Sequence, residues 1–270
     1  MKKSNLLILI LTLIFSVASL SACKEDENTI VVGASSTPHA EILAAAKPLL
    51  EEKGYTLKIE VFDDYVMPNT TLQSGDLDAN YFQHLPYLNS FNAKKKTDLV
   101  SVGPVHYEPF GLYGKGITDL SNVPSGTVIF IPNDDSNLTR ALLLLAQENL
   151  IEIDSSKNAT TGVDLKDVTD NKGYELKAVD AGLVPAQYKN NNNILAVING
   201  NYALSANISI STALAVEDAA GDAATTYANI IAVKAGNETN PKIVALYEVL
   251  TSQTIKDYIT NTYNGAVLPL

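Results

Sequence analysis

The sequence of 270 residues contains one cysteine, Cys23, and one arginine, Arg140. A single cysteine excludes a disulfide within the chain, so packing alone must stabilise the fold. Several enzyme motifs are also missing, namely a Gly-rich phosphate loop, His-Glu-x-x-His and Gly-x-Ser-x-Gly. No pair of a nucleophile and a base stands out. We therefore expect a protein that is not an enzyme and that carries no cofactor.

The chain has few basic residues for its number of acids. It holds 19 lysines and arginines against 30 aspartates and glutamates, a net charge of −11. Residues 1–22 carry two of the lysines and no acid, so the remainder has 17 basic against 30 acidic residues, a net charge of −13. This surplus disfavours binding to nucleic acid or to anionic lipid headgroups. We expect no nucleic-acid partner.

The first 22 residues have the layout of a secretory signal peptide. Two lysines precede an apolar run over residues 6–15, which is too short to span a membrane, and small residues follow. Residues 20–23 (Leu-Ser-Ala-Cys) resemble the lipobox of bacterial lipoproteins. The resemblance implies cleavage before Cys23, acylation of Cys23 (palmitate is a typical chain) and a tether over residues 23–28. An ordinary signal peptide with a chance cysteine is the alternative.

Strand patterns and helix patterns alternate along the rest of the chain. Strands are predicted at residues 29–33, 55–62, 99–105, 127–131, 194–198 and 230–233. Helices are predicted at residues 39–53, 85–95, 137–150 and 241–262. This alternation is typical of an α/β fold, and we expect mostly parallel sheets.

The lone arginine lies in a setting that favours an anion. Residues 131–140 run from a strand through a turn into the first turn of a helix, where free N–H groups and the helix dipole attract negative charge. Asn137 and Arg140 are three residues apart and can share one helix face. A guanidinium offers a planar, two-pronged donor set that fits a carboxylate. The alternative is a salt bridge to a nearby acid: Asp134, Asp135 or Glu148.

A second candidate site is aromatic. Tyr65, Phe82 and Tyr87 are able to wall an apolar pocket, with His84 as its polar tip. Pockets for small molecules have this composition. The residues by themselves favour the simpler interpretation, in which the aromatic rings belong to the core and His84 is a turn residue.

Five blocks of the sequence occur in a diagnostic order. They are residues 62–69 (Phe-Asp-Asp-Tyr-Val-Met-Pro-Asn), 75–87 (Gly-Asp-Leu-Asp-Ala-Asn-Tyr-Phe-Gln-His-Leu-Pro-Tyr), 132–145 (Pro-Asn-Asp-Asp-Ser-Asn-Leu-Thr-Arg-Ala-Leu-Leu-Leu-Leu), 195–199 (Leu-Ala-Val-Ile-Asn) and 227–231 (Tyr-Ala-Asn-Ile-Ile). Together they resemble the signature blocks of the NlpA lipoprotein family, the methionine-binding proteins of a bacterial ABC importer.

The resemblance implies a two-lobed fold like that of type II periplasmic binding proteins, with a ligand cleft between the lobes. Lobe I is expected to comprise residues 29–110 plus 226–270, and lobe II residues 111–225. The implied function is the capture of methionine and its delivery to an ABC permease. The implied location is the extracytoplasmic side of the cell membrane, where the lipid anchors the protein.

The resemblance also assigns roles to particular side chains. Those that match the family's side-chain pocket are Tyr65, Phe82, His84 and Tyr87. Arg140 and Asn137 match the residues that hold the ligand carboxylate. Asn199 and Asn229 match the asparagines that hold the amino and carboxylate groups.

Parts of the chain depart from the family pattern. Residues 152–193 match loosely, and Gly200-Asn201 are not the residues expected after Asn199. Another small amino acid or a methionine-containing dipeptide is therefore an alternative ligand. A further alternative is a lipoprotein that captures a metal ion through His39, His84, His106 and nearby carboxylates, although the scattered histidines do not define a metal site by themselves.

Substitution of Cys23 tests the predicted anchor. Cys23→Ala is expected to abolish incorporation of labelled fatty acid and to release the protein from membranes, because the thiol that carries the lipid is gone. Ligand binding should persist, because a tether separates the lipid from the fold. Labelled fatty acid on the variant would refute the lipobox assignment. Loss of binding in a well-folded variant would refute the separation of anchor and fold.

Overall fold

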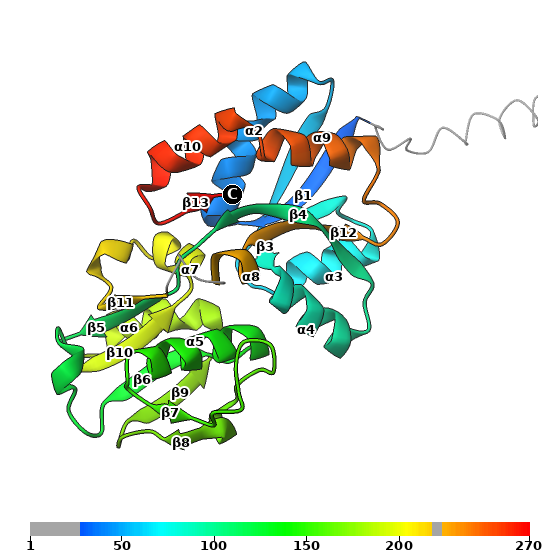
Figure 1. Ribbon diagram of the computed structural model, residues 1–270. Coiled ribbons are helices and arrows are strands. Elements are labelled where there is room, and N and C mark those ends of the chain that lie inside the picture. The colour runs from blue at the N-terminus through cyan, green and yellow to red at the C-terminus, as the bar shows by residue number, and fades with distance from the viewer. Residues whose placement is uncertain (1–27, 218–222) are drawn as a thin grey trace, which may run out of the picture.

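The computed structural model describes residues 28–217 and 223–270 (Figure 1). The predicted signal peptide, Cys23 and nearly all of the predicted tether lie outside the described residues. Within the described residues, no helix is both long enough and apolar enough to cross a lipid bilayer.

Lobe I is built on a six-stranded sheet with the order β13-β4-β12-β3-β1-β2. Its strands are β1 (Thr29–Ser35), β2 (Thr56–Phe62), β3 (Ala79–His84), β4 (Leu99–Tyr107), β12 (Asn229–Lys234) and β13 (Leu268–Pro269). Its helices are α2 (Glu41–Glu52), α3 (Met67–Ser74), α4 (Leu85–Lys95), α8 (Ala223–Thr226), α9 (Pro241–Leu250) and α10 (Gln253–Tyr263), and a π-helical turn (Ser36–Ala40) precedes α2.

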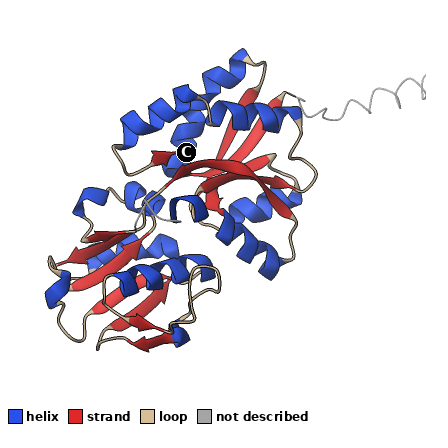
Figure 2. Ribbon diagram, viewed as in Figure 1, coloured by secondary structure: helices blue, strands red, loops and turns tan. Residues whose placement is uncertain are grey.

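Apolar residues on both faces of this sheet explain the layers of lobe I. Ile30 and Val32 of β1 pack with side chains of α2, α9 and α10, such as Leu246. On the opposite face, Leu72 of α3 and Leu88 of α4 form a separate cluster with residues of β4 and β12. Figures 1 and 2 show helices on both sides of the sheet.

Lobe II is built on a five-stranded sheet with the order β11-β5-β10-β6-β9. Its strands are β5 (Gly111–Lys115), β6 (Val128–Pro132), β9 (Glu175–Val179), β10 (Ile194–Ile198) and β11 (Ala215–Val216), and β7 (Glu152–Ile153) pairs separately with β8 (Val168–Asp170). Its helices are α5 (Asp135–Gln147), α6 (Val184–Asn190) and α7 (Gly200–Ser205).

The period-2 alternation of side chains divides the core of lobe II. Ile129 and Ile131 of β6 face the α5 side, where they cluster with Leu142. Phe130, between them in the chain, points to the other face and clusters with Val184 of α6. Successive side chains of a strand point to opposite faces, so a strand buried on both sides reads as a continuous apolar run.

The two sheets are mixed, so the prediction of mostly parallel sheets is wrong. β1 runs parallel to β2 and β3, and β6 runs parallel to β9 and β10. β12 lies antiparallel between β3 and β4, and β5 lies antiparallel to β10. The chain enters lobe II at β5 and re-enters lobe I at β12. Each of these two strands runs antiparallel to both of its neighbours in the sheet.

The chain passes between the sheets twice. It leaves the six-stranded sheet after Tyr107 and enters the five-stranded sheet at Gly111, and it returns between Val216 and Asn229. Figure 1 shows β4 leading out of lobe I toward β5. The predicted lobe boundaries fall within these connections and stay a prediction.

Most predicted elements are present, with one clear correction. The single helix predicted over residues 241–262 is two helices, α9 and α10. Thr251 Oγ1 donates to the Tyr247 carbonyl at 2.8 Å and Ser252 Oγ donates to the Val249 carbonyl at 2.6 Å, while Ser252 itself is extended. Hydroxyl groups that bond nearby backbone compete with helical hydrogen bonds, which accounts for the break.

Candidate functional site

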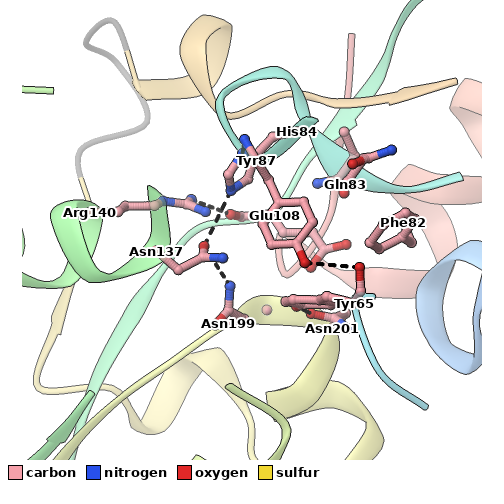
Figure 3. A pocket seen from close by; sticks show the side chains of 12 residues that line it. Tyr65, Phe82, Gln83, His84, Tyr87, Glu108, Asn137, Arg140, Asn199 and Asn201 are labelled. Atoms are coloured by element: carbon pink, nitrogen blue, oxygen red, sulfur yellow. Dashed lines mark hydrogen bonds between the residues drawn. The ribbon is translucent and has the colours of Figure 1, made fainter. Parts of the chain in front are cut away.

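A pocket between the two lobes brings together all eight ligand-binding residues that the sequence predicts (Figure 3). Its volume is about 340 Å³, including its opening to solvent. The eight are Tyr65, Phe82, His84, Tyr87, Asn137, Arg140, Asn199 and Asn229. Sequence reasoning missed four further lining residues: Gln83, Glu108, Gly200 and Asn201.

Lobe I supplies an aromatic wall. Tyr65 follows β2, Phe82 lies on β3 and Tyr87 lies in the first turn of α4. The ring centroid of Tyr65 is 5.7 Å from that of Phe82 and 5.6 Å from that of Tyr87. The Tyr87 hydroxyl donates to the Tyr65 backbone carbonyl at 2.9 Å, which holds the Tyr87 ring against this segment. The wall is apolar where it faces the pocket, as expected for the side chain of a small ligand.

Contacts across the cleft hold the two lobes together at this wall. The Tyr65 hydroxyl donates to Asn201 Oδ1 at 2.6 Å. The Tyr202 ring, also from α7, lies 4.8 Å from the Tyr65 ring, and its hydroxyl donates to the Asp63 carbonyl at 3.2 Å. The structure therefore represents a closed arrangement of the cleft.

A chain of polar groups runs from His84 into lobe II. The Tyr87 backbone N–H donates to His84 Nδ1 at 3.2 Å, so the ring proton lies on Nε2, which donates to Asn137 Oδ1 at 3.2 Å. Asn199 Nδ2 donates to the same oxygen at 2.9 Å. Burial and the charge of Arg140 lower the pKa of His84 to about 3, so the ring is neutral at physiological pH.

The Asn137 amide is fully used inside the protein. Its Nδ2 donates to both carboxylate oxygens of Asp134 at 3.0 Å, and its oxygen accepts the two bonds from His84 and Asn199. Asn199 Oδ1, by contrast, is buried and has no hydrogen-bond partner among the described residues. A buried acceptor that lacks a partner is costly, so this oxygen points to a donor on a ligand.

Arg140 is held by a residue that sequence reasoning did not consider. Nε donates to both carboxylate oxygens of Glu217 at 2.8 Å, Nη2 also donates to Glu217, and Nη2 donates to the Glu108 carbonyl at 2.9 Å. The alternative partners Asp134, Asp135 and Glu148 are not those that the structure shows. Burial alone would lower the pKa of Arg140, but Glu217 raises it above its ordinary value.

Aromatic rings enclose the guanidinium of Arg140. Its central carbon lies 4.5 Å from the ring centroid of Tyr227 and 4.7 Å from that of Phe110. The Tyr107 hydroxyl donates to Glu217 at 2.6 Å and fixes the carboxylate from the other side. The two-pronged donor set expected to meet a ligand thus bonds Glu217 in this arrangement.

A second buried polar cluster borders the pocket behind Asn229. His106 Nε2 lies 2.8 Å from Glu108 Oε1, and its Nδ1 bonds the Tyr81 hydroxyl. His39 Nε2 lies 3.0 Å from Asn229 Oδ1 and 3.5 Å from Glu108 Oε1. Burial lowers the pKa of His39 to about 4 and that of His106 to about 3, and it raises the pKa of Glu108.

This cluster contains two of the three histidines in the predicted metal set. One potential ligand atom from each of His39, His106 and Glu108 lies within 4.8 Å of the others. His84 is not part of the group and bonds Asn137 instead. Two neutral imidazoles and a carboxylate are plausible ligands for a divalent ion, so the donor set fits the metal alternative in kind.

Comparison with known proteins assigns the chain to a family. Residues 30–270 match the family model described as NlpA lipoprotein. The chain belongs to the NlpA lipoprotein family. The predicted family and the predicted two-lobed α/β fold are thereby confirmed.

Three relatives illustrate the range of the family. The methionine-binding lipoprotein MetQ of Bacillus subtilis is 44% identical over 256 residues, which cover 93% of this chain and 92% of MetQ. A nutrient-binding protein from Burkholderia cenocepacia, solved bound to methionine, is 34% identical with a TM-score of 0.83 and covers 89% of this chain and 99% of its own. A periplasmic substrate-binding protein of an ABC transporter from Coxiella burnetii is 32% identical with a TM-score of 0.82, covering 89% and 100%.

The missed lining residues carry weak signals in the sequence. Glu108 lies between the strand predicted at residues 99–105 and the lobe boundary predicted after residue 110. A single acid in such an apolar segment is unusual. Gly200 and Asn201 differ from the residues that the family pattern predicts after Asn199, and this difference is their only signal in the sequence. Glu217 gives no local signal, because its partner Arg140 lies 77 residues earlier.

The buried neutral histidines predict a loss of stability in acid. The pKa of His84 is about 3 in the folded state against 6.5 for an unperturbed histidine, so the unfolded chain binds more protons between these values. The free energy of unfolding should fall as pH decreases through this window, by up to about 1.4 kcal/mol per pH unit for each such histidine. His84→Gln should therefore flatten the curve of unfolding free energy against pH, measured by urea denaturation.

The same experiment contains its control. Above pH 7 the histidines are neutral in both states, so the difference between variant and wild type should be constant there. The raised pKa of Glu108 acts in the opposite sense, but it is present in both proteins and cancels in the difference. Parallel curves from pH 7 down to pH 4 would contradict the prediction.

Proposed function

We propose that this protein captures free methionine on the extracytoplasmic side of the membrane and delivers it to the permease of an ABC importer. The observation that carries the proposal is the meeting of all eight predicted ligand residues in one pocket between the lobes. The relatives support it: one is named a methionine-binding lipoprotein, another was solved bound to methionine, and a third is a transporter's substrate-binding protein.

Roles follow from the chemistry of each wall. We assign the thioether side chain to the space against Tyr65, Phe82 and Tyr87, beside the neutral ring of His84. An unbranched apolar chain gains by burial against aromatic rings, and sulfur contacts such rings favourably. The polar ends of the amino acid then lie toward Arg140 and the asparagines.

Arg140 and Asn229 are assigned to the ligand carboxylate. Glu217 and the Glu108 carbonyl accept hydrogen bonds from Nε and Nη2 of Arg140, and we assign Nη1 to the ligand. Asn229 accepts from His39 through Oδ1, so its Nδ2 is the end that can donate. Asn199 Oδ1 is assigned to the amino group, and Asn137 orients both Asn199 and His84.

Binding and release require no bond to be made or broken, so we infer that the protein is not an enzyme. The ligand contacts both lobes only when the cleft is closed, and this differential contact favours closure. A lipid on Cys23 would keep the protein at the membrane near its permease. Acyl chains contribute about 0.8 kcal/mol per buried CH₂, and two or more hold a protein firmly.

The alternative ligands make different demands on the site. A methionine-containing dipeptide or another small amino acid would use the same pocket. Capture of a metal ion is the alternative with an observation of its own, because His39, His106 and Glu108 already lie together.

Methionine should stabilise the folded protein. At one hundred times its dissociation constant, a ligand adds about 2.7 kcal/mol to the free energy of unfolding. For a protein of this size, this corresponds to a rise of roughly 5–10 °C in melting temperature. Differential scanning fluorimetry of the domain lacking residues 1–22 measures it. A rise with zinc or manganese and none with methionine would instead support the metal alternative.

Arg140→Lys tests the carboxylate assignment. Lysine keeps the charge opposite Glu217 but lacks the planar fork, so it cannot bond Glu217 and the ligand together. We expect at least about a tenfold loss of methionine affinity, or 1.4 kcal/mol, by calorimetry. Methionine amide, which has no carboxylate charge, should bind wild type poorly and lose much less. Equal losses for the acid and the amide would show that Arg140 does not hold the carboxylate.

A further inference from the structure

Glu108 is a buried carboxylate surrounded by hydrogen-bond donors. Its side chain lies at the point where the chain leaves lobe I, and only 5% of the residue is exposed. His106 Nε2 lies 2.8 Å from Oε1, with the Tyr81 hydroxyl on the other ring nitrogen. His39 Nε2 lies 3.5 Å from the same oxygen. An ionised carboxylate only accepts hydrogen bonds, so these donors favour the ionised form of Glu108, whereas burial opposes it and raises the pKa.

The protein supplies hydrogen bonds to Glu108 but no paired positive side chain. Among the described residues, the acidic partner of Arg140 is Glu217, and Arg140 reaches Glu108 only through its backbone carbonyl. His39 and His106 each contact Glu108 through one ring nitrogen, and no lysine or arginine among the described residues forms an ion pair with its carboxylate. A buried charge without an opposite charge is unfavourable. Glu108 is therefore a buried carboxyl group without a lysine or arginine partner, and because burial raises its pKa, an opposite charge on a ligand would stabilise its ionised form.

Glu108 faces the pocket beside the part of lobe II that closes over it. It lines the same cavity as Asn199, whose buried Oδ1 has no partner among the described residues. A side-chain carbon added to Gly200 would lie 2.8 Å from Glu108 Oε2, so only glycine allows this approach. Figure 3 shows Glu108 among the lining side chains, between Arg140 and the aromatic wall. A buried carboxyl group and an unpartnered amide oxygen thus line one cavity.

We propose that the Glu108 carboxylate is the counter-charge for the α-ammonium group of the bound amino acid and that it selects ligands with a free, charged amine. This inference rests on the proposed function. An ammonium has three donors and no acceptor, and both Glu108 and Asn199 Oδ1 offer acceptors. With the carboxylate held by Arg140, the site is complementary to a zwitterion.

Selection by Glu108 has a direct consequence for analogues. A ligand that lacks the amine leaves the Glu108 charge and the Asn199 oxygen unpaired in the closed cleft. A site built to bond a polar group rejects the analogue that lacks it far more strongly than an apolar pocket rejects one that lacks a methylene. Acylation of the amine has a similar effect, because it removes the positive charge.

A divalent metal ion is the competing cation. His39, His106 and Glu108 place their ligand atoms within 4.8 Å of one another. To bind a metal ion, His39 would have to give up its hydrogen bond to Asn229, and His106 would have to give up its hydrogen bond to Glu108. We therefore favour the ammonium, and the metal is one outcome of the test.

The test compares methionine with 4-(methylthio)butanoate, the same molecule without its amine, by calorimetry on wild type, Glu108→Gln and Tyr81→Phe. Wild type is expected to bind methionine at least about 30-fold more tightly than the deaminated analogue. Glu108→Gln should lose at least about 30-fold for methionine and lose nothing for the analogue, which removes the discrimination. Tyr81→Phe perturbs the same hydrogen-bond chain without lining the pocket, so it should keep the discrimination.

Each other outcome overturns the inference in a recognisable way. Equal losses for both ligands in Glu108→Gln would assign Glu108 a structural role only. Wild-type binding of both ligands within about threefold would exclude amine selection even if the variant did not fold. Zinc binding that is lost in Glu108→Gln while methionine affinity is unchanged would assign the residue to a metal. If wild type binds neither ligand, the proposed function fails, and this inference falls with it.

Discussion

The cleft depends on the burial of charge at the junction of the two lobes. Arg140 and Glu108 are almost fully buried there, and a buried charge must be paired or hydrogen-bonded. Arg140 is paired with Glu217 and enclosed by aromatic rings, whereas the Glu108 carboxylate contacts His106 and His39 of lobe I. The neutral histidines and the bonded asparagines serve this arrangement, because they position donors and acceptors without adding charge.

The predicted ligand residues meet in one pocket because several of them follow strands. Asn199 comes directly after β10, His84 ends β3, and Arg140 lies in the helix that follows β6. Ligands of open α/β sheets bind at the carboxyl ends of strands, so residues at these positions converge. Local periodicity also locates most strands and helices, and the resemblance that the five motif blocks carry to the NlpA family implies two lobes and a cleft.

What the sequence does not predict depends on contacts between distant residues. The pairing of Arg140 with Glu217 joins residues 77 positions apart, and no local sequence pattern near either residue predicts the other. Glu108 gains its importance only when lobe II closes over it. The mixed sheets arise because β12 is inserted between β3 and β4, an arrangement that no local pattern encodes. The lobe boundaries and the ligand roles of individual side chains therefore remain predictions that experiment must decide.

The insertion of β12 also sets the order in which the protein can fold. Lobe II takes all five strands of its sheet from one continuous stretch, residues 111–216, so this sheet can assemble as soon as that stretch is made. Lobe I cannot close its sheet until residues 229–234 arrive, because β12 separates β3 from β4. The predicted signal peptide implies export as an unfolded chain, and this delay would then keep lobe I open during export. The half that begins the chain stays incomplete, with an open sheet, until nearly all of the polypeptide has been synthesised.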